Sequence, residues 1–301
     1  MPSRPRPILI DMPLHIKEKI VHYAEIESRF QLRNCSQECR DLVDNIPTVY
    51  TNLSFKYRIC SLEEDHNGYE FTVKSGKSRF YRNFPTVQSM DLFLKHFSIF
   101  LKNPKAKFEQ IHIATAHFPK NQLKAVLSSL NHQVAVKNLS LSDCFQPNAE
   151  FLILILPYLK PGYLEHMDLG YISGDTDLSG ITDLEQFKQA KSAVIRGHCL
   201  EIPIAKLLHF RRLECDSLSF LTVENVQTII DNALRQGEEF DRWVLETLDS
   251  NDSIEDHFGT ERTFNVPNSD HRLTFAHDGE RFYLTNETRR QMEVDLFFKD
   301  F

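Results

Sequence analysis

The chain has 301 residues, which is enough for one large domain or for a small module followed by a larger one. Its hydrophobic content of 41% and charged content of 26% are those of a folded globular protein rather than a disordered one. The net charge of −7 argues against nucleic-acid binding as the main function, so we expect no nucleic-acid partner.

The N-terminal residues do not resemble a secretory signal. Asp11 and Pro13 interrupt the short apolar run 8–10, so no apolar core of signal-peptide length forms. The longest purely apolar stretch, Phe151 to Leu156, is far shorter than the roughly 20 residues that a membrane helix needs. We therefore expect a cytoplasmic or nuclear protein without a membrane partner.

The cysteines are scattered and stand mostly at apolar-patterned positions, which is typical of reduced core residues. They are Cys35, Cys39, Cys60, Cys144, Cys199 and Cys215. The first two lie one helical turn apart and could form half of a zinc site, but no second Cys or His pair completes it. Core packing is the better interpretation, and we expect no metal and no cofactor.

Residues 12–44 predict three short helices. Pro13 suits a first helical turn, Ser36 is the expected N-cap of the third helix, and Pro47 ends it. The first helix carries apolar residues at helical spacing, namely Leu14, Ile16, Ile20 and Val21. Three such helices bury too little surface to be stable alone. They form either an N-terminal cap on a larger domain or a docking surface for a partner.

The residues themselves favour docking. Met12-Pro13-Leu14, Phe30 to Ser36 and Arg40 to Asp44 resemble an F-box, whose motif opens with an apolar–Pro pair. We place this module at residues 8–46. The resemblance implies binding to a Skp1-like protein and, through it, to a cullin-RING ubiquitin ligase. The residues implied to bind the Skp1-like protein are Pro13, Leu14, Ile16, Ile20, Leu32 and Leu42.

Residues 47–104 form a connecting β/α segment. Alternating apolar residues predict three strands, at Leu53 to Ile59, Tyr69 to Val73 and Arg79 to Tyr81. Asn67-Gly68 and Ser75-Gly76 mark the turns between them. Residues 86–102 return to helical periodicity.

Residues 105–248 contain a recurring template, h-x-x-h-x-h, in which h is apolar. It occurs at Phe108/Ile111/Ile113, Val136/Leu139/Leu141, Leu164/Met167/Leu169, Ala190/Ala193/Ile195, Phe210/Leu213/Cys215 and Phe240/Trp243/Leu245. The last members are 28, 28, 26, 20 and 30 residues apart, and most gaps hold a helix signal. Those signals cover 119–130, 147–159 and 222–236, and Thr182 to Glu185 has a capping-box pattern.

A strand and a helix every 20–30 residues predict a leucine-rich-repeat-like solenoid with a parallel sheet. A non-solenoid α/β domain with parallel strands is the alternative. Strand alternation puts the residues between the buried ones on the exposed face of the sheet. The candidate target-binding residues there are His112, Asp168, Arg196, Glu214, Asp216 and Glu246. Because the C-terminal half of this face is acidic, we expect a partner segment that bears Lys or Arg.

The same region resembles a second family. Glu185 to Lys191, Leu208 to Phe210 and Val223 to Val226 look like the FTH domain of nematode F-box-A proteins. Together with the F-box, the resemblance covers about residues 8–245. It implies an adaptor that recognises a protein.

Residues 249–301 predict an acidic loop followed by a hairpin. Asp249 to Glu261 is short of apolar residues, which indicates an exposed loop. Asp278-Gly279 is a two-residue turn signal that pairs Phe275 with Phe282 and Leu273 with Leu284. We expect this C-terminal hairpin to cap the open end of the solenoid.

No catalytic constellation is found in the sequence. G-x-S-x-G, H-E-x-x-H and P-loop motifs are absent, and the adjacent His198-Cys199 pair is a poor nucleophile–base arrangement. We therefore expect no enzyme activity. The leading hypothesis is a substrate receptor of a ubiquitin ligase. The alternatives are a Skp1-bound scaffold or inhibitor that does not promote degradation, and an α/β enzyme with an unrecognised site.

Overall fold

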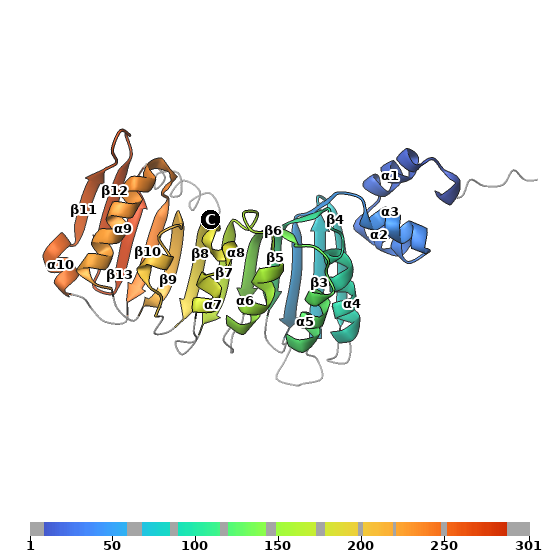
Figure 1. The fold of residues 1–301 in the computed structure, drawn as a ribbon, viewed down its shortest axis with the longest axis horizontal. Helices are drawn as coiled ribbons and strands as arrows, with labels where there is room; N and C mark the ends of the chain where they lie inside the picture. The colour runs from blue at the N-terminus through green and yellow to red at the C-terminus, as the bar shows by residue number, and fades with distance from the viewer. Residues whose placement is uncertain are drawn as a thin grey trace, which may run out of the picture. The chain divides into compact units, whose positions relative to one another are not determined.

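The computed structural model describes residues 9–58, 68–84, 90–114, 120–142, 149–172, 178–197, 201–218, 221–247 and 252–287. The architecture is mixed α/β, with three N-terminal helices followed by strands and helices (Figure 1). The chain divides into two compact units. The first comprises Met1–Ser140 and Pro157–Tyr163, and the second comprises Leu141–Leu156 and Leu164–Phe301.

The three predicted N-terminal helices are confirmed. They are α1 (Leu14–Tyr23), α2 (Ile26–Arg33) and α3 (Gln37–Asp44), preceded by the short 3₁₀ helix η1 (Leu9–Asp11). Ser36 caps α3 as predicted, because its hydroxyl oxygen accepts a hydrogen bond from the backbone N–H of Cys39 at 3.1 Å.

The strands of the first unit mix parallel and antiparallel pairs. They are β1 (Thr48–Tyr50), β2 (Asn52–Arg58), β3 (Gly68–Ser75), β4 (Ser78–Phe84), β5 (Ala106–Ala114) and β6 (Ala135–Ser142), whose last two residues belong to the second unit. Their order is β6-β5-β2-β3-β4, and β1 also pairs with β5. Strand β2 runs parallel to β5 and antiparallel to β3, which in turn is antiparallel to β4.

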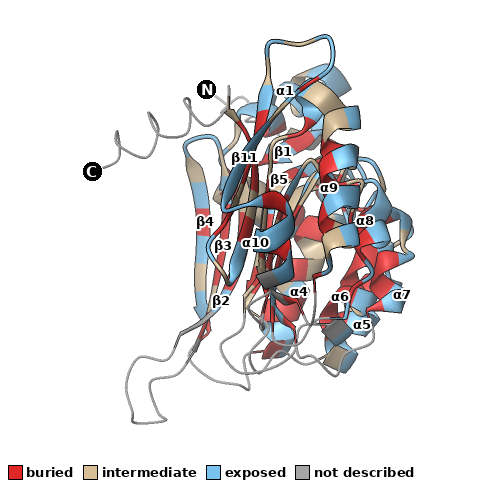
Figure 2. Cartoon of the chain, turned by 90° about the vertical axis from the view of Figure 1, so that its left-hand side faces the viewer, coloured by how far each residue is buried: buried red, intermediate tan, exposed pale blue. Residues whose placement is uncertain are grey.

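Helices α4 (Met90–Leu101) and α5 (Lys120–Ser128) lie on one side of β2, β3 and β4 (Figure 2). An aromatic core joins the two layers: the ring of Phe93 on α4 lies 4.3 Å from that of Phe55 and 5.6 Å from that of Phe71. Within the described part of the first unit, no helix covers the opposite face of β2, β3 and β4.

The second unit contains parallel strands that continue into antiparallel ones. The strands are β7 (His166–Ile172), β8 (Ser192–Gly197), β9 (Arg212–Leu218), β10 (Arg242–Thr247), β11 (Glu261–Asn265), β12 (Arg272–His277) and β13 (Arg281–Asn286). Their order is β11-β12-β13-β10-β9-β8-β7. Strands β7 to β10 are parallel, whereas β13 pairs antiparallel with β10.

The helices of the second unit are short except for one. They are α6 (Ala149–Ile155), η4 (Leu156–Tyr158), α7 (Ser179–Thr182), α8 (Glu185–Lys188), η5 (Ile204–Lys206), α9 (Val223–Gln236), η6 (Gly237–Glu239) and α10 (Asp252–Phe258), where η4 reaches into the first unit. The predicted start and end of α9 are confirmed: Thr222 is its N-cap, and Gly237 follows it with φ at +60°.

The apolar template marks the core in both units. All six triplets are at most 3% exposed. Trp243, the only tryptophan of the chain, is 1% exposed, and its indole N–H donates a hydrogen bond to the carbonyl oxygen of Phe210 at 3.1 Å. The prediction of buried strands is thus confirmed, and in the second unit β7 to β10 are parallel as expected. The solenoid itself stays a prediction.

Two helix predictions were wrong. Thr182 does not cap a following helix: it is the last residue of α7, and α8 begins at Glu185 without a side-chain cap. The expected loop at Asp249 to Glu261 contains α10. Its apolar residues Ile254 and Phe258 stand four apart and are both buried, and their burial stabilises a helix in an otherwise acidic segment.

The predicted hairpin forms with a different register. Phe275 pairs with Leu284, and Phe282 pairs with His277, which leaves four residues in the turn. Within the turn, the backbone N–H of Asp278 donates to the carbonyl oxygen of Arg281 at 3.2 Å, and the Asp278 carboxylate accepts a hydrogen bond from the backbone N–H of Arg281 at 2.8 Å. The apolar residues nevertheless share one buried face as predicted. Strand β11 adds a third strand to the hairpin, and a capping role stays a prediction.

The cysteine prediction holds for Cys39 and Cys215, which are buried, but Cys35 is exposed. Cys60, Cys144 and Cys199 lie outside the described residues, as does His198. No described helix has the length and apolar character needed to cross a membrane.

Candidate protein-interaction surfaces

Helix α1 leaves large apolar side chains in solvent. Leu14 is 63% exposed, Ile20 is 42% exposed and Tyr23 is 83% exposed. Ile16, Ile20 and Tyr23 stand at positions i, i+4 and i+7 and share one side of the helix, with Leu14 at its start. We call these four residues the α1 apolar surface. Val21, predicted on the same stripe, instead points inward and is fully buried.

The remaining predicted docking residues are accessible as well. Pro13 is exposed, and Leu32 on α2 and Leu42 on α3 are half-buried. A bidentate ion pair joins α2 to α3: the Arg33 guanidinium contacts the Asp44 carboxylate at 2.7 and 2.8 Å. This pair, in which Arg33 is only 8% exposed, fixes the relative positions of the two helices.

Helix α2 anchors the three-helix module to the rest of the first unit. The ring of Phe30 lies 4.8 Å from that of Phe80 on β4, and 4.9 and 6.2 Å from those of His96 and Phe100 on α4. Burial lowers the pKa of His96, and the nearby Arg82 acts in the same direction. The module is therefore partly a cap, as the first interpretation proposed, but its α1 apolar surface has no such cover among the described residues.

The predicted target-binding residues alternate with buried ones as expected. His112 on β5 belongs to the first unit. The other five belong to the second unit: Asp168 on β7, Arg196 on β8, Glu214 and Asp216 on β9, and Glu246 on β10. All six are half-buried or exposed. The structure thus brings the last five onto neighbouring parallel strands.

The acidic face of the second unit is partly neutralised. Arg196 contacts Asp168 at 2.9 Å, and Arg281 on β13 lies 3.5 Å from Glu246. Burial raises the pKa of Asp216, with Glu246 and Glu214 adding to the effect, while Arg196 and Arg281 oppose it. Arg281 was not identified in the sequence, although it directly precedes the buried Phe282 and so faces outward.

Cations were also missed on the first unit. Lys56 on β2, Lys74 on β3 and Arg79 on β4 are exposed and lie on the face that α4 and α5 leave uncovered. His112 lies on this face too, as the pairing partner of Ser54 on β2. Alternation within the predicted strands was the available signal, because Lys56 follows the buried Phe55 and Lys74 follows the buried Val73.

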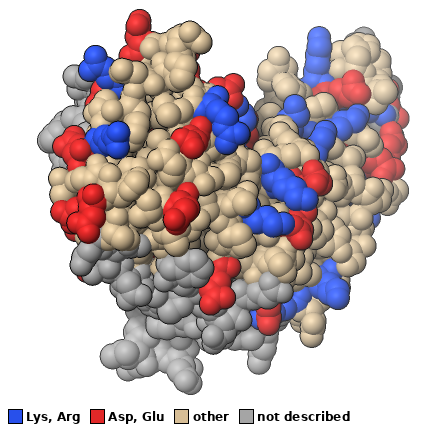
Figure 3. Space-filling model, turned by 60° about the vertical axis from the view of Figure 1, so that its left-hand side comes forward, with Lys and Arg blue, Asp and Glu red and all other residues tan. Residues whose placement is uncertain are grey.

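Elsewhere the surface carries mixed charge. On the side of the molecule shown in Figure 3, Lys and Arg side chains are interspersed with Asp and Glu. Among the described residues, no group of three or more His, Cys, Asp or Glu side chains is placed to hold a metal ion.

The chain is similar to known proteins in two respects. Residues 120–268 match the FTH domain family. Over 308 residues the chain is 25% identical to F-box A protein 224 of Caenorhabditis elegans, and the match covers 95% of this chain and 76% of that protein. No solved structure matches the chain. The two matches together support a relationship of the chain to the nematode F-box/FTH family.

Proposed function

We propose that the protein is a substrate-recognition adaptor of a Skp1–cullin–F-box ubiquitin ligase. Residues 8–46 are the F-box and bind a Skp1-like protein through Pro13, the α1 apolar surface, Leu32 and Leu42. The observation that carries the proposal is the exposure of Leu14, Ile20 and Tyr23 on one ten-residue helix, of which only Val21 is buried. Exposed apolar side chains of this size on one short helix are typical of an interface.

The recognition part follows the docking module. Residues 47–104 connect the two, residues 105–248 form the solenoid-like FTH region, and residues 249–301 close its end with β11 to β13. The target contacts the outer face of the strands through Asp168, Arg196, Glu214, Asp216 and Glu246, with His112 on the first unit. Four of the five residues on the second unit are carboxylates, and three of these lie on β9 and β10. A target segment that bears Lys or Arg would complement their negative charge.

The chain supplies proximity rather than chemistry in this proposal. The ubiquitin-transferring enzymes are provided by the cullin-RING assembly, and this protein orients a target near them. Action in the cytoplasm or nucleus and the lack of a cofactor belong to the same proposal. A scaffold or inhibitor that binds the Skp1-like protein without promoting degradation would use the same surfaces, so only the fate of the target separates the two.

The first experiment tests docking with substitutions that leave the core intact. Each apolar side chain buried at an interface contributes about 1.5–3 kcal/mol, so Leu14→Ala/Ile20→Ala should weaken binding to a purified Skp1-like protein by at least about 100-fold. Isothermal titration calorimetry measures this change. Deleting residues 8–46 is a poorer test, because it would also expose the rings that pack on Phe30.

A matched control comes from α4. The exposed fraction of Leu92, 49%, is similar to those of Leu14 and Ile20, but Leu92 lies outside the three-helix module. Leu92→Ala should bind the Skp1-like protein as the unmodified chain does. Equal binding by all variants would contradict the F-box assignment. Once a target is known, its abundance in cells with and without Leu14→Ala/Ile20→Ala separates adaptor from scaffold.

A further inference from the structure

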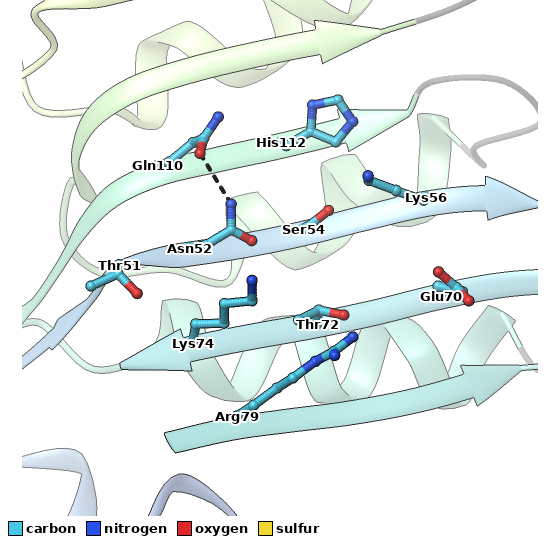
Figure 4. A pocket seen from close by; sticks show the side chains of 10 residues that line it. All are labelled: Thr51, Asn52, Ser54, Lys56, Glu70, Thr72, Lys74, Arg79, Gln110 and His112. Atoms are coloured by element: carbon cyan, nitrogen blue, oxygen red, sulfur yellow. Dashed lines mark hydrogen bonds between the residues drawn. The ribbon is translucent and has the colours of Figure 1, made fainter. Parts of the chain in front are cut away.

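The uncovered face of β2 to β5 in the first unit contains a polar hollow of about 590 Å³ (Figure 4). Its floor includes the hydroxyl-bearing residues Ser54 and Thr72, which are pairing partners on β2 and β3 and are 7% and 9% exposed. Asn52 on β2 donates a hydrogen bond from its side-chain amide to Gln110 on β5 at 3.1 Å. The hollow is therefore lined by groups that can exchange hydrogen bonds with a bound polar chain.

The charges around the hollow are mostly positive. Lys56, Lys74 and Arg79 line it against a single carboxylate, Glu70, in a chain whose net charge is −7. Glu70 is the pairing partner of Lys56 and accepts a hydrogen bond from the Tyr81 hydroxyl at 2.9 Å. The carboxylate thus lies at the Lys56 end, and the positive charge is concentrated at the Lys74 and Arg79 end.

Lys74 and Arg79 are directly opposed on neighbouring strands. Like charges in that position destabilise a sheet, and within the described residues neither side chain forms an ion pair. The Arg79 guanidinium lies over the Tyr81 ring, 5.1 Å from its centre. Figure 4 shows Arg79 lying along the sheet toward Thr72, and Lys74 extending toward β2. A bound anion between them would remove the repulsion and accept hydrogen bonds from both.

The dimensions suit a short extended segment. From Asn52 to Lys56 the strand rises about 13 Å, and from β5 to β4 the sheet spans about 14 Å at the usual strand spacing. A segment of about four extended residues fits within this length.

We propose that this hollow binds an anionic peptide segment of a partner protein, with a carboxylate or phosphate group placed between Lys74 and Arg79. The hollow lies outside residues 120–268, the part that matches the FTH family. The hollow shares only His112 with the proposed target-binding residues and uses neither the α1 apolar surface nor β7 to β10. Because the test substitutions Lys74→Glu and Arg79→Glu lie outside both of those surfaces, failure of this proposal is separable from failure of the ligase adaptor proposal.

The test uses the full chain and degenerate seven-residue peptide libraries whose central residue is fixed as phosphoserine, Glu, Ser or Lys. Peptides retained on the immobilised protein are sequenced. The unmodified chain should enrich the phosphoserine and Glu libraries at least tenfold over the Ser library. Lys74→Glu/Arg79→Glu should lose this enrichment, and it replaces one like-charged pair by another, so the repulsion in the sheet is kept. A larger enrichment for phosphoserine than for Glu would assign the anion as phosphate.

The control has the same charge change on another surface. Lys102→Glu/Lys124→Glu alters exposed residues near α4 and on α5, and it should retain the enrichment. No enrichment over the Ser library, or equal enrichment by Lys74→Glu/Arg79→Glu, would overturn the proposal. Binding of the chain to phosphatidylserine vesicles but to no peptide library would also overturn the proposal, because the partner would then be a membrane.

A second measurement does not depend on peptides. Lys74→Glu alone replaces the repulsion with Arg79 by an attraction, so its Tm should rise while enrichment of anionic peptides falls. Inorganic phosphate, compared with chloride at equal ionic strength, should raise the Tm of the unmodified chain more than that of Lys74→Glu. The same phosphate response in both proteins would contradict an anion site at this pair.

Discussion

Helix α1 and strand β9 both carry apolar side chains at a regular spacing, but their surroundings differ. Leu213 and Cys215 on β9 are at most 1% exposed, between two neighbouring strands. Leu14 and Ile20 on α1 are 63% and 42% exposed. The two regions show that an apolar pattern predicts that a surface will be covered, without saying whether the same chain covers it.

The three-helix module contains both kinds of surface, one packed against the same chain and one exposed. Phe30 packs against the ring of Phe80 in the first unit, whereas Leu14, Ile20 and Tyr23 on α1 are exposed. The module thus contacts the rest of the first unit through α2, and it exposes the apolar side chains of α1 to solvent. Four variants test this distinction through the stability of the folded protein.

The largest effect is expected in the strand core. Leu213→Ala should lower the free energy of unfolding by about 2–5 kcal/mol, because it removes buried methyl groups and leaves a cavity. Urea denaturation measures the change. Glu214→Ala, at the adjacent outward position, is the control and should stay within about 0.5 kcal/mol. A similar loss of unfolding free energy for both variants would show that Glu214 does not lie on a solvent-exposed face of the sheet.

Phe30→Ala should have the next largest effect. Its ring contacts Phe80 and Phe100, but the side chain is only half-buried, so we expect a loss of about 2 kcal/mol. The module should also lose its fixed attachment to β4, which hydrogen exchange at residues 14–44 would report. Unchanged exchange there would mean that other contacts, such as the ion pair of Arg82 with Glu27 at 2.6 Å, are sufficient.

A pH-dependent effect is expected at the same contact. The folded state lowers the pKa of His96 below its ordinary value, because burial and nearby cations disfavour the charged ring. The folded protein then binds fewer protons than the unfolded chain, so stability is lost as the pH falls below about 6.5. His96→Phe keeps the ring contacts and removes the titration.

The measurement is the Tm from pH 7.5 down to pH 5. His96→Phe should lose less Tm over this range than the unmodified chain, and the exposed His15→Gln serves as the control. Parallel Tm curves for all three proteins would assign the acid sensitivity to other groups.

The smallest effect on folding is expected on α1. Leu14→Ala/Ile20→Ala should change the free energy of unfolding by no more than about 0.5 kcal/mol per substitution, since both side chains already lie in solvent. The same variant should show the largest loss of Skp1-like binding. If the variant loses both its folded structure and its binding, the three helices would be better interpreted as an N-terminal cap than as a docking module.

Much of the fold was predictable from local pattern. The three N-terminal helices, the buried template residues and the start of α9 at Thr222 follow from spacing and capping residues. Strand alternation also placed Glu214 and Glu246 on the outer face. These features depend on neighbours in sequence, so a single sequence contains the necessary information.

The errors have a different origin. Helix α10 depends on the burial of Ile254 and Phe258, which the acidic residues around them obscure. The hairpin register differs from the one expected for a two-residue turn, and the Asp278 side chain takes part in the turn by accepting a hydrogen bond from the backbone N–H of Arg281. The side of the hollow that Gln110 lines requires knowing that β2 lies beside β5, a pairing between strands more than fifty residues apart. Such contacts are set by tertiary packing rather than by local pattern.

The buried Trp243 gives the protein a built-in optical probe. The indole lies on β10 in the second unit, and the chain has no other tryptophan. Light emitted on excitation at about 295 nm therefore comes from the second unit alone, and a red shift signals that water has reached the indole of this strand. Circular dichroism averages over both units. Disagreement between the two signals during denaturation would reveal that the units unfold in separate steps.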